Sequence, residues 1–239
     1  ITLKEAFKDN PKFLRKYLYA DWSALDMINQ LISSEVIISS AERIENGLEI
    51  TSMGIDVARY GDDKTVFTIL KNGNIELIES YEQTSITEIV TRTIQLIHDY
   101  NIDPNYVGID SVGVGAGVVD NLKSAGYDVI ELQGGSKPEE SQYEEAFLPF
   151  NLRSQMYYEL RRDMMNGQIG NLTDETLKLE LQSIQYEIYS DKKVKVISKE
   201  AIKKLLGRSP DYADSLVYAN WVKTYRGGIK WYMAISGGL

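Results

Sequence analysis

The sequence predicts an α/β fold, in which helices flank a mixed central sheet of five strands and an extra β-hairpin follows late in the chain. Three observations lead to this prediction. Three strand-like segments are joined by short turns, helical and strand-like patterns then alternate, and two further strand-like segments occupy residues 184–197. Because hairpins produce antiparallel neighbours and strand–helix–strand units produce parallel ones, the sheet should contain three antiparallel strands followed by parallel strands.

The first half of the chain supplies the five strands of this sheet. Strands are expected at residues 48–57, 65–70, 75–81, 106–110 and 127–132, where apolar residues concentrate. The dipeptide Asn72-Gly73 predicts a tight turn between the second strand and the third. Ser85 and Glu88 have the spacing of a capping box and should begin a helix that extends to about residue 100. A glycine-rich turn at residues 113–117 leads into a second helix, which should end near residue 125.

The second half is predicted to be mainly helical. Helices are expected at about residues 152–166, 174–181, 198–206 and 209–224, and a hairpin should turn at residues 190–192. Ser209 should act as the N-cap of the last helix, with Pro210 in its first turn. Tyr218 and Trp221 on that helix are expected in the core. Arg153 shares its helix with acidic residues, so it is expected to form surface ion pairs.

Residues 1–48 differ in character from the rest. They look helical and amphipathic and end in an acidic, turn-prone segment at residues 42–47. We interpret them as a linker or as the tail of a preceding domain, so that the main domain comprises residues 49–239. The first residue is Ile1 rather than methionine, which favours a fragment or a processed chain.

Composition restricts the chemistry that this chain can carry out. It contains no cysteine and one histidine, His98, which is expected to be exposed or half-buried, so a zinc site of cysteine and histidine ligands is excluded. A metal site must use oxygen ligands, which points to magnesium or manganese. The net charge of −9 counts against a surface that holds nucleic acid by itself. An acidic metal site, or DNA delivered by another domain, would reconcile this charge with a nuclease. No apolar run is long enough to span a membrane, and no signal peptide is visible.

Three aspartates stand out because of where they lie in the predicted elements. Asp56 lies near the end of the first strand, Asp110 ends the fourth, and Asp214 lies in the first turns of the last helix. A carboxylate inside an apolar strand is unfavourable unless it is paired, hydrogen-bonded or bound to a metal ion. If the first and fourth strands are neighbours, Asp56 and Asp110 face each other, and carboxylates that close need a cation or a proton between them.

Asp211 lies three residues before Asp214 and therefore on the same face of the last helix. Near a helix N-terminus the macrodipole alone favours negative charge, which explains Asp211 as well as metal binding does. Asp214 is surrounded in sequence by Ala213, Leu216 and Val217, so its side chain is expected to point inward.

Four segments resemble, in order, segments of phage terminase large subunits. Residues 54–66, which begin Gly54-Ile-Asp56-Val-Ala-Arg59, resemble the first motif of the family's nuclease domain, and residues 107–110 with the glycines after them resemble the second. Residues 198–200 and 207–216 resemble the third, and residues 10–22 resemble the segment that joins the family's ATPase to its nuclease. The resemblance therefore covers nearly the whole chain.

This resemblance implies an RNase H-like nuclease domain that cuts double-stranded, concatemeric viral DNA during genome packaging. The implied partners are double-stranded DNA, the ATPase domain of the same full-length chain, a small terminase subunit and a portal protein, all in the host cell cytoplasm. The sequence contains no Gly-x-x-x-x-Gly-Lys-Ser/Thr loop, so this chain alone should not hydrolyse ATP. Some relatives carry histidine at the position of Asp211, which leaves its role as a ligand open.

Metal chemistry suggests a two-ion mechanism for this nuclease. Two Mg²⁺ or Mn²⁺ ions roughly 4 Å apart would hold the scissile phosphate, one activating a water and the other stabilising the leaving 3′ oxygen. We expect Asp56 to bridge the ions and Asp110 and Asp214 each to complete one site. Asp211 would assist directly or through water.

Basic residues near these motifs are candidates for contacts with DNA. The hairpin carries the best basic patch of the chain, and Lys199 precedes the helix that leads toward Asp211, so it is expected to approach the site. For the residues near the first carboxylate, solvated surface charge is an equally good explanation. The candidates are Arg59, Lys64, Lys192, Lys193, Lys195 and Lys199.

Three other interpretations remain open. Another RNase H-like nuclease, such as a Holliday-junction resolvase or RNase H itself, would use similar carboxylates, but the linker-like first segment and the late hairpin favour a terminase. A sugar-kinase or actin-like ATPase shares this strand order, yet such proteins usually contain two copies of the fold. A non-catalytic packaging or docking module would have no need of four retained acids, and only an assay separates it from the enzyme.

Overall fold

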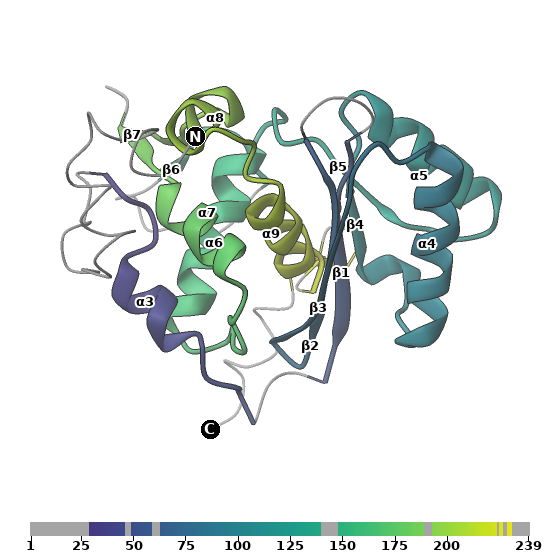
Figure 1. Cartoon of the computed structure of the whole chain (residues 1–239), viewed down its shortest axis with the longest axis horizontal. Coiled ribbons are helices and arrows are strands. Elements are labelled where there is room, and N and C mark those ends of the chain that lie inside the picture. The colour runs from purple at the N-terminus through teal and green to yellow at the C-terminus, as the bar shows by residue number, and fades with distance from the viewer. Residues whose placement is uncertain are drawn as a thin grey trace.

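A five-stranded sheet, seen nearly edge-on in Figure 1, forms the centre of the molecule. The structure is a computed structural model that describes residues 29–45, 49–58, 63–139, 148–188 and 193–223, with two short backbone segments beyond them. The strand order is β3-β2-β1-β4-β5. β2 is antiparallel to β1 and to β3, whereas β4 is parallel to β1 and β5 is parallel to β4, which confirms the predicted mixed sheet. The strands are Thr51–Asp56 (β1), Thr65–Lys71 (β2), Asn74–Tyr81 (β3), Val107–Asp110 (β4) and Ile130–Leu132 (β5).

Two helices cover one face of this sheet, on the right in Figure 1: Ile86–Asp99 (α4) and Val114–Ser124 (α5). The predicted capping box is confirmed, because the Ser85 hydroxyl accepts from the Glu88 N–H and the Glu88 carboxylate accepts from the Ser85 N–H. A single-turn 3-10 helix, Pro104–Tyr106 (η2), precedes β4. Alternate residues of β1, Met53 and Ile55, are fully buried in the apolar cluster on this side. The other residues of β1 therefore face the opposite side.

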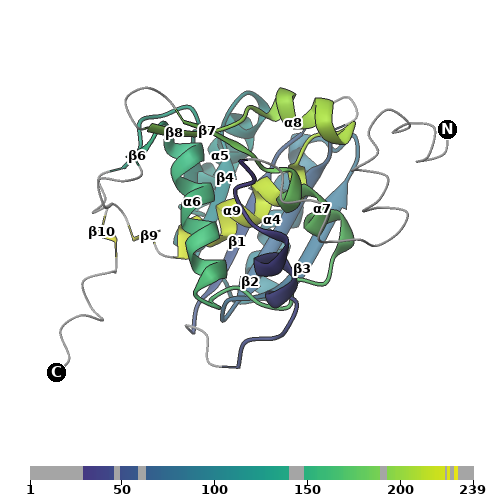
Figure 2. The same cartoon turned by 90° about the vertical axis from the view of Figure 1, so that its left-hand side faces the viewer.

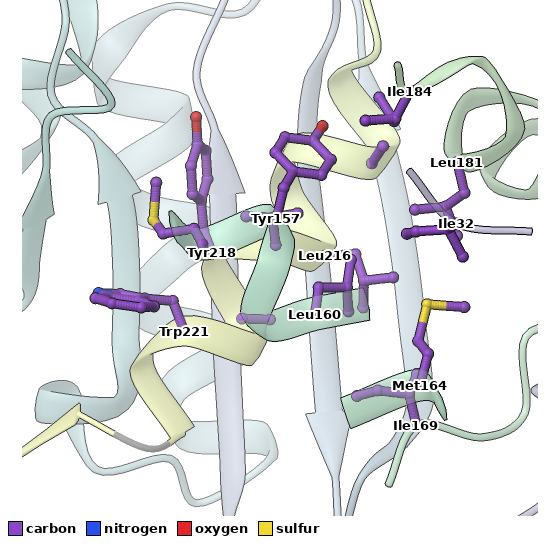
Figure 3. Packing of buried hydrophobic residues seen from close by; sticks show 14 of the residues in the cluster. Ile32, Tyr157, Leu160, Met164, Ile169, Leu181, Ile184, Leu216, Tyr218 and Trp221 are labelled. Carbon is purple, nitrogen blue, oxygen red and sulfur yellow. The ribbon is translucent and has the colours of Figure 1, made fainter. Parts of the chain in front are cut away.

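On the opposite face, α9 packs directly on the sheet, and α3, α6 and α7 lie outside it (Figures 1 and 2). Almost every residue of α9 is buried, which is why its apolar residues do not form a single stripe. Figure 3 shows the packing of α6 against α9, and the predicted core positions Tyr218 and Trp221 are confirmed as buried. The four helices are Ser34–Ser39 (α3), Leu152–Met165 (α6), Glu175–Ser183 (α7) and Asp211–Lys223 (α9).

The predicted late hairpin is part of a second, three-stranded sheet. Tyr186–Ile188 (β7) and Lys193–Val196 (β8) are antiparallel, as expected, and lead into the helix Lys199–Leu206 (α8). A short strand, Leu148–Pro149 (β6), pairs in parallel with β8. The sequence did not predict β6, because two residues that include a proline have no strand periodicity. Backbone pairing also joins Tyr225–Arg226 (β9) and Ile229–Lys230 (β10).

The segment before β1 contributes to the core. Leu31, Ile32 and Ile37 are buried in the same cluster as α6, α7 and α9. Residues 1–28 lie outside the described residues, so the linker and the domain boundary at residue 48 stay predictions. Among the described residues, none of the helices combines the length and the apolar character needed to cross a membrane.

Candidate functional site

The alternation of β1 and β4 brings two carboxylates to one end of the sheet. The two strands pair in parallel with Gly54 opposite Gly108, so Asp56 and Asp110, two residues further on, point to the same face as these glycines. That face carries α9. A Cβ at Gly54 would lie 2.0 Å from the carbonyl oxygen of Ser215 in α9, so a glycine is needed for this close approach.

α9 brings Asp211 and Asp214 to the same end of the sheet. A hydrogen bond of 2.7 Å between the Thr68 and Ser215 hydroxyls fixes the helix on β2. Asp214 is fully buried, which confirms that it points inward, and Asp211 is 7% exposed. The Oδ2 atom of Asp211 accepts a hydrogen bond of 2.9 Å from the Lys64 N–H, so this carboxylate also holds the start of β2.

The ammonium group of Lys199, the first residue of α8, lies between Asp56 and Asp214. Its Nζ atom is 3.0 Å from both carboxylate oxygens of Asp56 and 2.9 Å from Oδ2 of Asp214. The expected approach of Lys199 to the site is therefore observed. Burial disfavours the charged ammonium, but the charges of Asp214 and Asp56 outweigh burial and raise the pKa of Lys199 well above its ordinary value.

The second carboxylate oxygen of Asp214 is bound by α6. Its Oδ1 atom accepts a hydrogen bond of 2.7 Å from the Tyr157 hydroxyl and lies 3.4 Å from Nη2 of Arg153. Arg153 also donates from Nη1 to the carbonyl oxygen of Ile197 at 2.8 Å. The expectation of a surface ion pair for Arg153 is wrong, since only 13% of its side chain is exposed. The sequence does contain a sign of this shared contact: Arg153 and Tyr157 are four residues apart, which places both side chains on one face of the helix.

Burial governs the protonation of the other carboxylates. It raises the pKa of Asp56 well above its ordinary value, and the charges of Asp214, Asp211 and Asp110 add to this effect while Lys199 opposes it. Burial likewise raises the pKa of Asp110 and of Asp211. The pKa of Asp214 is lowered in spite of its burial, because Lys199, Arg153 and Tyr157 all favour its charged form. The site thus holds more carboxylates than its own cations neutralise.

This donor set fits a divalent cation. Carboxylate oxygens are the preferred ligands of Mg²⁺ and suit Mn²⁺, and Asp56 and Asp214 already converge on one positive charge. Within the described residues, no three acidic or histidine side chains surround a common ion position as they stand. Binding of an ion by Asp56 and Asp214 together therefore requires the Lys199 ammonium to move from between them.

The remaining predicted residues lie at varied distances from the carboxylates. Lys64 forms an ion pair of 3.1 Å with Glu82. Lys193 and Lys195 lie on β8, where Lys195 Nζ is 4.9 Å from the centre of the Phe150 ring. Arg59 and Lys192 lie outside the described residues.

Two further residues near α9 were assigned differently or not at all from the sequence. α9 begins at Asp211, so Ser209 is not its N-cap, and the Ser209 hydroxyl instead donates to Asp63 at 2.8 Å. Glu180 of α7 was not predicted as functional. Its carboxylate accepts from the Ala213 N–H at 2.8 Å and forms an ion pair of 2.9 Å with Arg208, so it supports the beginning of α9.

Solved structures share this arrangement of elements. The nuclease domain of the large terminase subunit of bacterial virus Sf6 aligns with a TM-score of 0.68 at 21% identity, over 80% of this chain and 97% of that one. A lysine-to-alanine mutant of that domain, solved with manganese and β-thujaplicinol, aligns with a TM-score of 0.66 at 19% identity, over 80% and 97%. The large terminase nuclease of thermophilic phage G20c, solved with bound magnesium, aligns with a TM-score of 0.55 at 21% identity, over 82% and 98%. No protein-family model and no curated protein matches the sequence. The chain therefore has the RNase H-like fold of the nuclease domains of phage large terminase subunits.

Proposed function

We propose that this chain is a divalent-metal-dependent endonuclease that cuts double-stranded DNA. The observation that carries the proposal is the convergence of buried carboxylates from β1 and α9 on one cation position, next to the end of β4. Nuclease domains of the same fold have been solved with manganese and with magnesium, which supports a metal-dependent reaction. Asp56, Asp110 and Asp214 are the catalytic ligands in this proposal, and Asp211 is a fourth, direct or water-mediated.

Different residues of the chain would have different roles at this site. When bound, two Mg²⁺ or Mn²⁺ ions would polarise the scissile phosphate, lower the pKa of the attacking water and stabilise the leaving 3′ oxygen. Burial raises the pKa of Asp56, so binding of an ion by this carboxylate would strengthen as pH rises. Asp214 is held in its charged form and would be ready to bind. Lys199 would neutralise the carboxylates before the ions bind.

The substrate and partners follow from the same proposal. Lys193 and Lys195 on β8, together with Lys192, would contact the phosphates of DNA, and Arg59, Lys64 and Lys199 would do so near Asp56. The cellular role would be the cutting of concatemeric viral DNA during packaging, in the host cytoplasm. The ATPase domain of the same full-length chain, a small terminase subunit and a portal protein would be the partners.

Plasmid cleavage tests the proposed activity. Supercoiled DNA would be incubated with the chain in Mn²⁺, in Mg²⁺ or in EDTA, and Asp56→Asn would be compared with Asp120→Asn. Asp120 is an exposed aspartate of α5, so its variant loses the same charge away from the site. We expect metal-dependent linearisation that is lost only in Asp56→Asn. A folded chain that cuts nothing with either metal, over a wide protein range, would contradict the proposal.

A further inference from the structure

Asp214 has two carboxylate oxygens with entirely different partners. Oδ1 is turned toward α6, where Tyr157 donates to it at 2.7 Å and Arg153 lies at 3.4 Å. Oδ2 is turned toward the cation position, where its partner is the Lys199 ammonium at 2.9 Å. Asp214 is fully buried, so neither oxygen faces bulk solvent. Within the described residues, Oδ1 is therefore held by hydrogen bonds, whereas Oδ2 has the Lys199 ion pair but no hydrogen bond.

The two residues that bind Oδ1 are themselves fixed. Tyr157 is fully buried in α6, and Figure 3 shows its ring beside Tyr218 of α9, with both hydroxyl groups turned the same way. The Arg153 guanidinium lies 4.9 Å from the centre of the Tyr157 ring and donates to the Ile197 carbonyl oxygen two residues before Lys199. The pair thus links α6, α9 and the start of α8 behind the carboxylate.

We propose that Tyr157 and Arg153 are positioning residues, which hold Asp214 so that Oδ2 alone is offered to a metal ion. This inference rests on the proposed function, because it concerns the ligand role of Asp214. A ligand whose second oxygen is already hydrogen-bonded binds with one oxygen and a defined direction. Partners of this kind typically contribute about 10- to 100-fold to metal affinity or activity.

The test is the affinity of the whole chain for Mn²⁺, measured by isothermal titration calorimetry. Tyr157→Phe removes only the hydroxyl group and keeps the ring in the core. Tyr127→Phe is the matched control, since the Tyr127 hydroxyl also binds one side chain, His98 at 2.8 Å, but lies before β5 at the far end of the sheet. We expect roughly 10-fold weaker Mn²⁺ binding in Tyr157→Phe and no change in Tyr127→Phe.

Three further measurements separate positioning from general stability. The melting temperature in EDTA should be lower for Tyr157→Phe than for Tyr127→Phe, because only the first loses a hydrogen bond to a buried carboxylate, and it shows at which temperature both variants are folded for the Mn²⁺ titrations. The Mn²⁺ concentration for half-maximal plasmid cleavage should rise in Tyr157→Phe, while the rate at saturating Mn²⁺ falls much less. In an Asp214→Asn background, Tyr157→Phe should cause no additional loss of Mn²⁺ affinity, because its effect passes through that carboxylate.

Arg153→Lys provides a second route, because it keeps the positive charge but loses the forked donor. It too should weaken Mn²⁺ binding. If the wild type binds Mn²⁺ and both Tyr157→Phe and Tyr127→Phe bind it with the same affinity, the positioning role is refuted. This result would leave the proposed nuclease function unaffected. A wild-type chain that takes up no Mn²⁺ and cuts no DNA would overturn both.

Discussion

At the scale of single residues, Lys199 decides how the carboxylates of the site coexist. Its ammonium contacts Asp56 and Asp214 at 2.9–3.0 Å. We expect Lys199→Met to lower the free energy of unfolding in EDTA by about 3 kcal/mol, since removing one partner leaves buried like charges together. The variant should also gain more stability from Mn²⁺ than the wild type does, because the ion no longer competes with the ammonium.

Urea denaturation with and without Mn²⁺ measures both effects of Lys199→Met. Lys204→Met is the control, because Lys204 is an exposed lysine of the same helix. If Mn²⁺ stabilised Lys199→Met, Lys204→Met and the wild type equally, Lys199 would not compete with the metal.

Glu180 gives the molecule a pH-dependent stability. Burial raises its pKa from 4.5 to about 8, although Arg208 and the Ala213 N–H favour its charged form. Between these values the folded chain binds a proton that the unfolded chain has lost, so stability falls as pH rises. The shift corresponds to a loss on the order of 4 kcal/mol between pH 5 and pH 8. Glu180→Gln cannot ionise and should lack this loss.

Urea denaturation of the wild type and Glu180→Gln at pH 5 and at pH 8.5 tests this prediction. Other ionisable groups are common to both proteins, so the difference between them isolates Glu180. The free energy of unfolding of Glu180→Gln should increase relative to that of the wild type as pH rises. A difference between the two proteins that does not change with pH would contradict a raised pKa of Glu180.

Sequence reasoning identified the carboxylates that meet at the site better than the residues that support them. Asp56 and Asp110 were predicted because a carboxylate in an apolar strand is conspicuous by itself. Tyr157 and Arg153 were not, because each is ordinary in its own helix and acquires its role only from Asp214, which lies about 60 residues away in the chain. Contacts across such distances depend on helix packing, which local periodicity does not determine.

At the scale of elements, the contact between β1 and α9 positions the whole site. Gly54 faces α9, and a Cβ there would lie 2.0 Å from the Ser215 carbonyl oxygen and 2.3 Å from the Ala219 nitrogen. We expect Gly54→Ala to push the helix away and to lower the free energy of unfolding by about 3 kcal/mol or more, because backbone atoms cannot yield as a side chain can.

Gly135→Ala is the matched control for this change, since a Cβ at Gly135 meets nothing within 4 Å. Urea denaturation should place its free energy of unfolding within about 0.5 kcal/mol of the wild type. Mn²⁺ affinity should fall in Gly54→Ala, if it folds, and stay constant in Gly135→Ala. Equal stability of the two variants would mean that the helix can shift without cost.

The order of elements was predictable because each strand and helix carries its own signal. The hairpin turn at Asn72-Gly73, the capping box at Ser85 and the late hairpin all lie where the sequence places them. The adjacency of β1 and β4, on which the expected pairing of Asp56 with Asp110 depended, is confirmed by their register. The strand β6 escaped prediction because it is defined by its partner β8 rather than by its own two residues.

At the scale of the whole molecule, the net charge of −9 conflicts with a DNA substrate. The carboxylates of the site contribute to this charge, and bound divalent ions would offset only part of it. If the proposed function holds, affinity for DNA would depend on small basic patches such as Lys193 and Lys195 on β8. Lys195 also lies over the ring of Phe150, which is 40% exposed at the same surface.

The salt dependence of DNA binding tests whether this patch binds the phosphates. Removing one lysine that neutralises a phosphate should reduce the slope of log K against log salt concentration by about 0.9. We expect the double variant Lys193→Gln/Lys195→Gln to reduce the slope by nearly two units in fluorescence-anisotropy titrations with duplex DNA. Lys71→Gln/Lys123→Gln removes the same charge from the end of β2 opposite to the site and from the end of α5. That control should keep the wild-type slope, because phosphate binding rather than net charge determines it. If both double variants reduced the slope equally, β8 would contribute only to the overall field, and the DNA would have to be held by other parts of the packaging machinery.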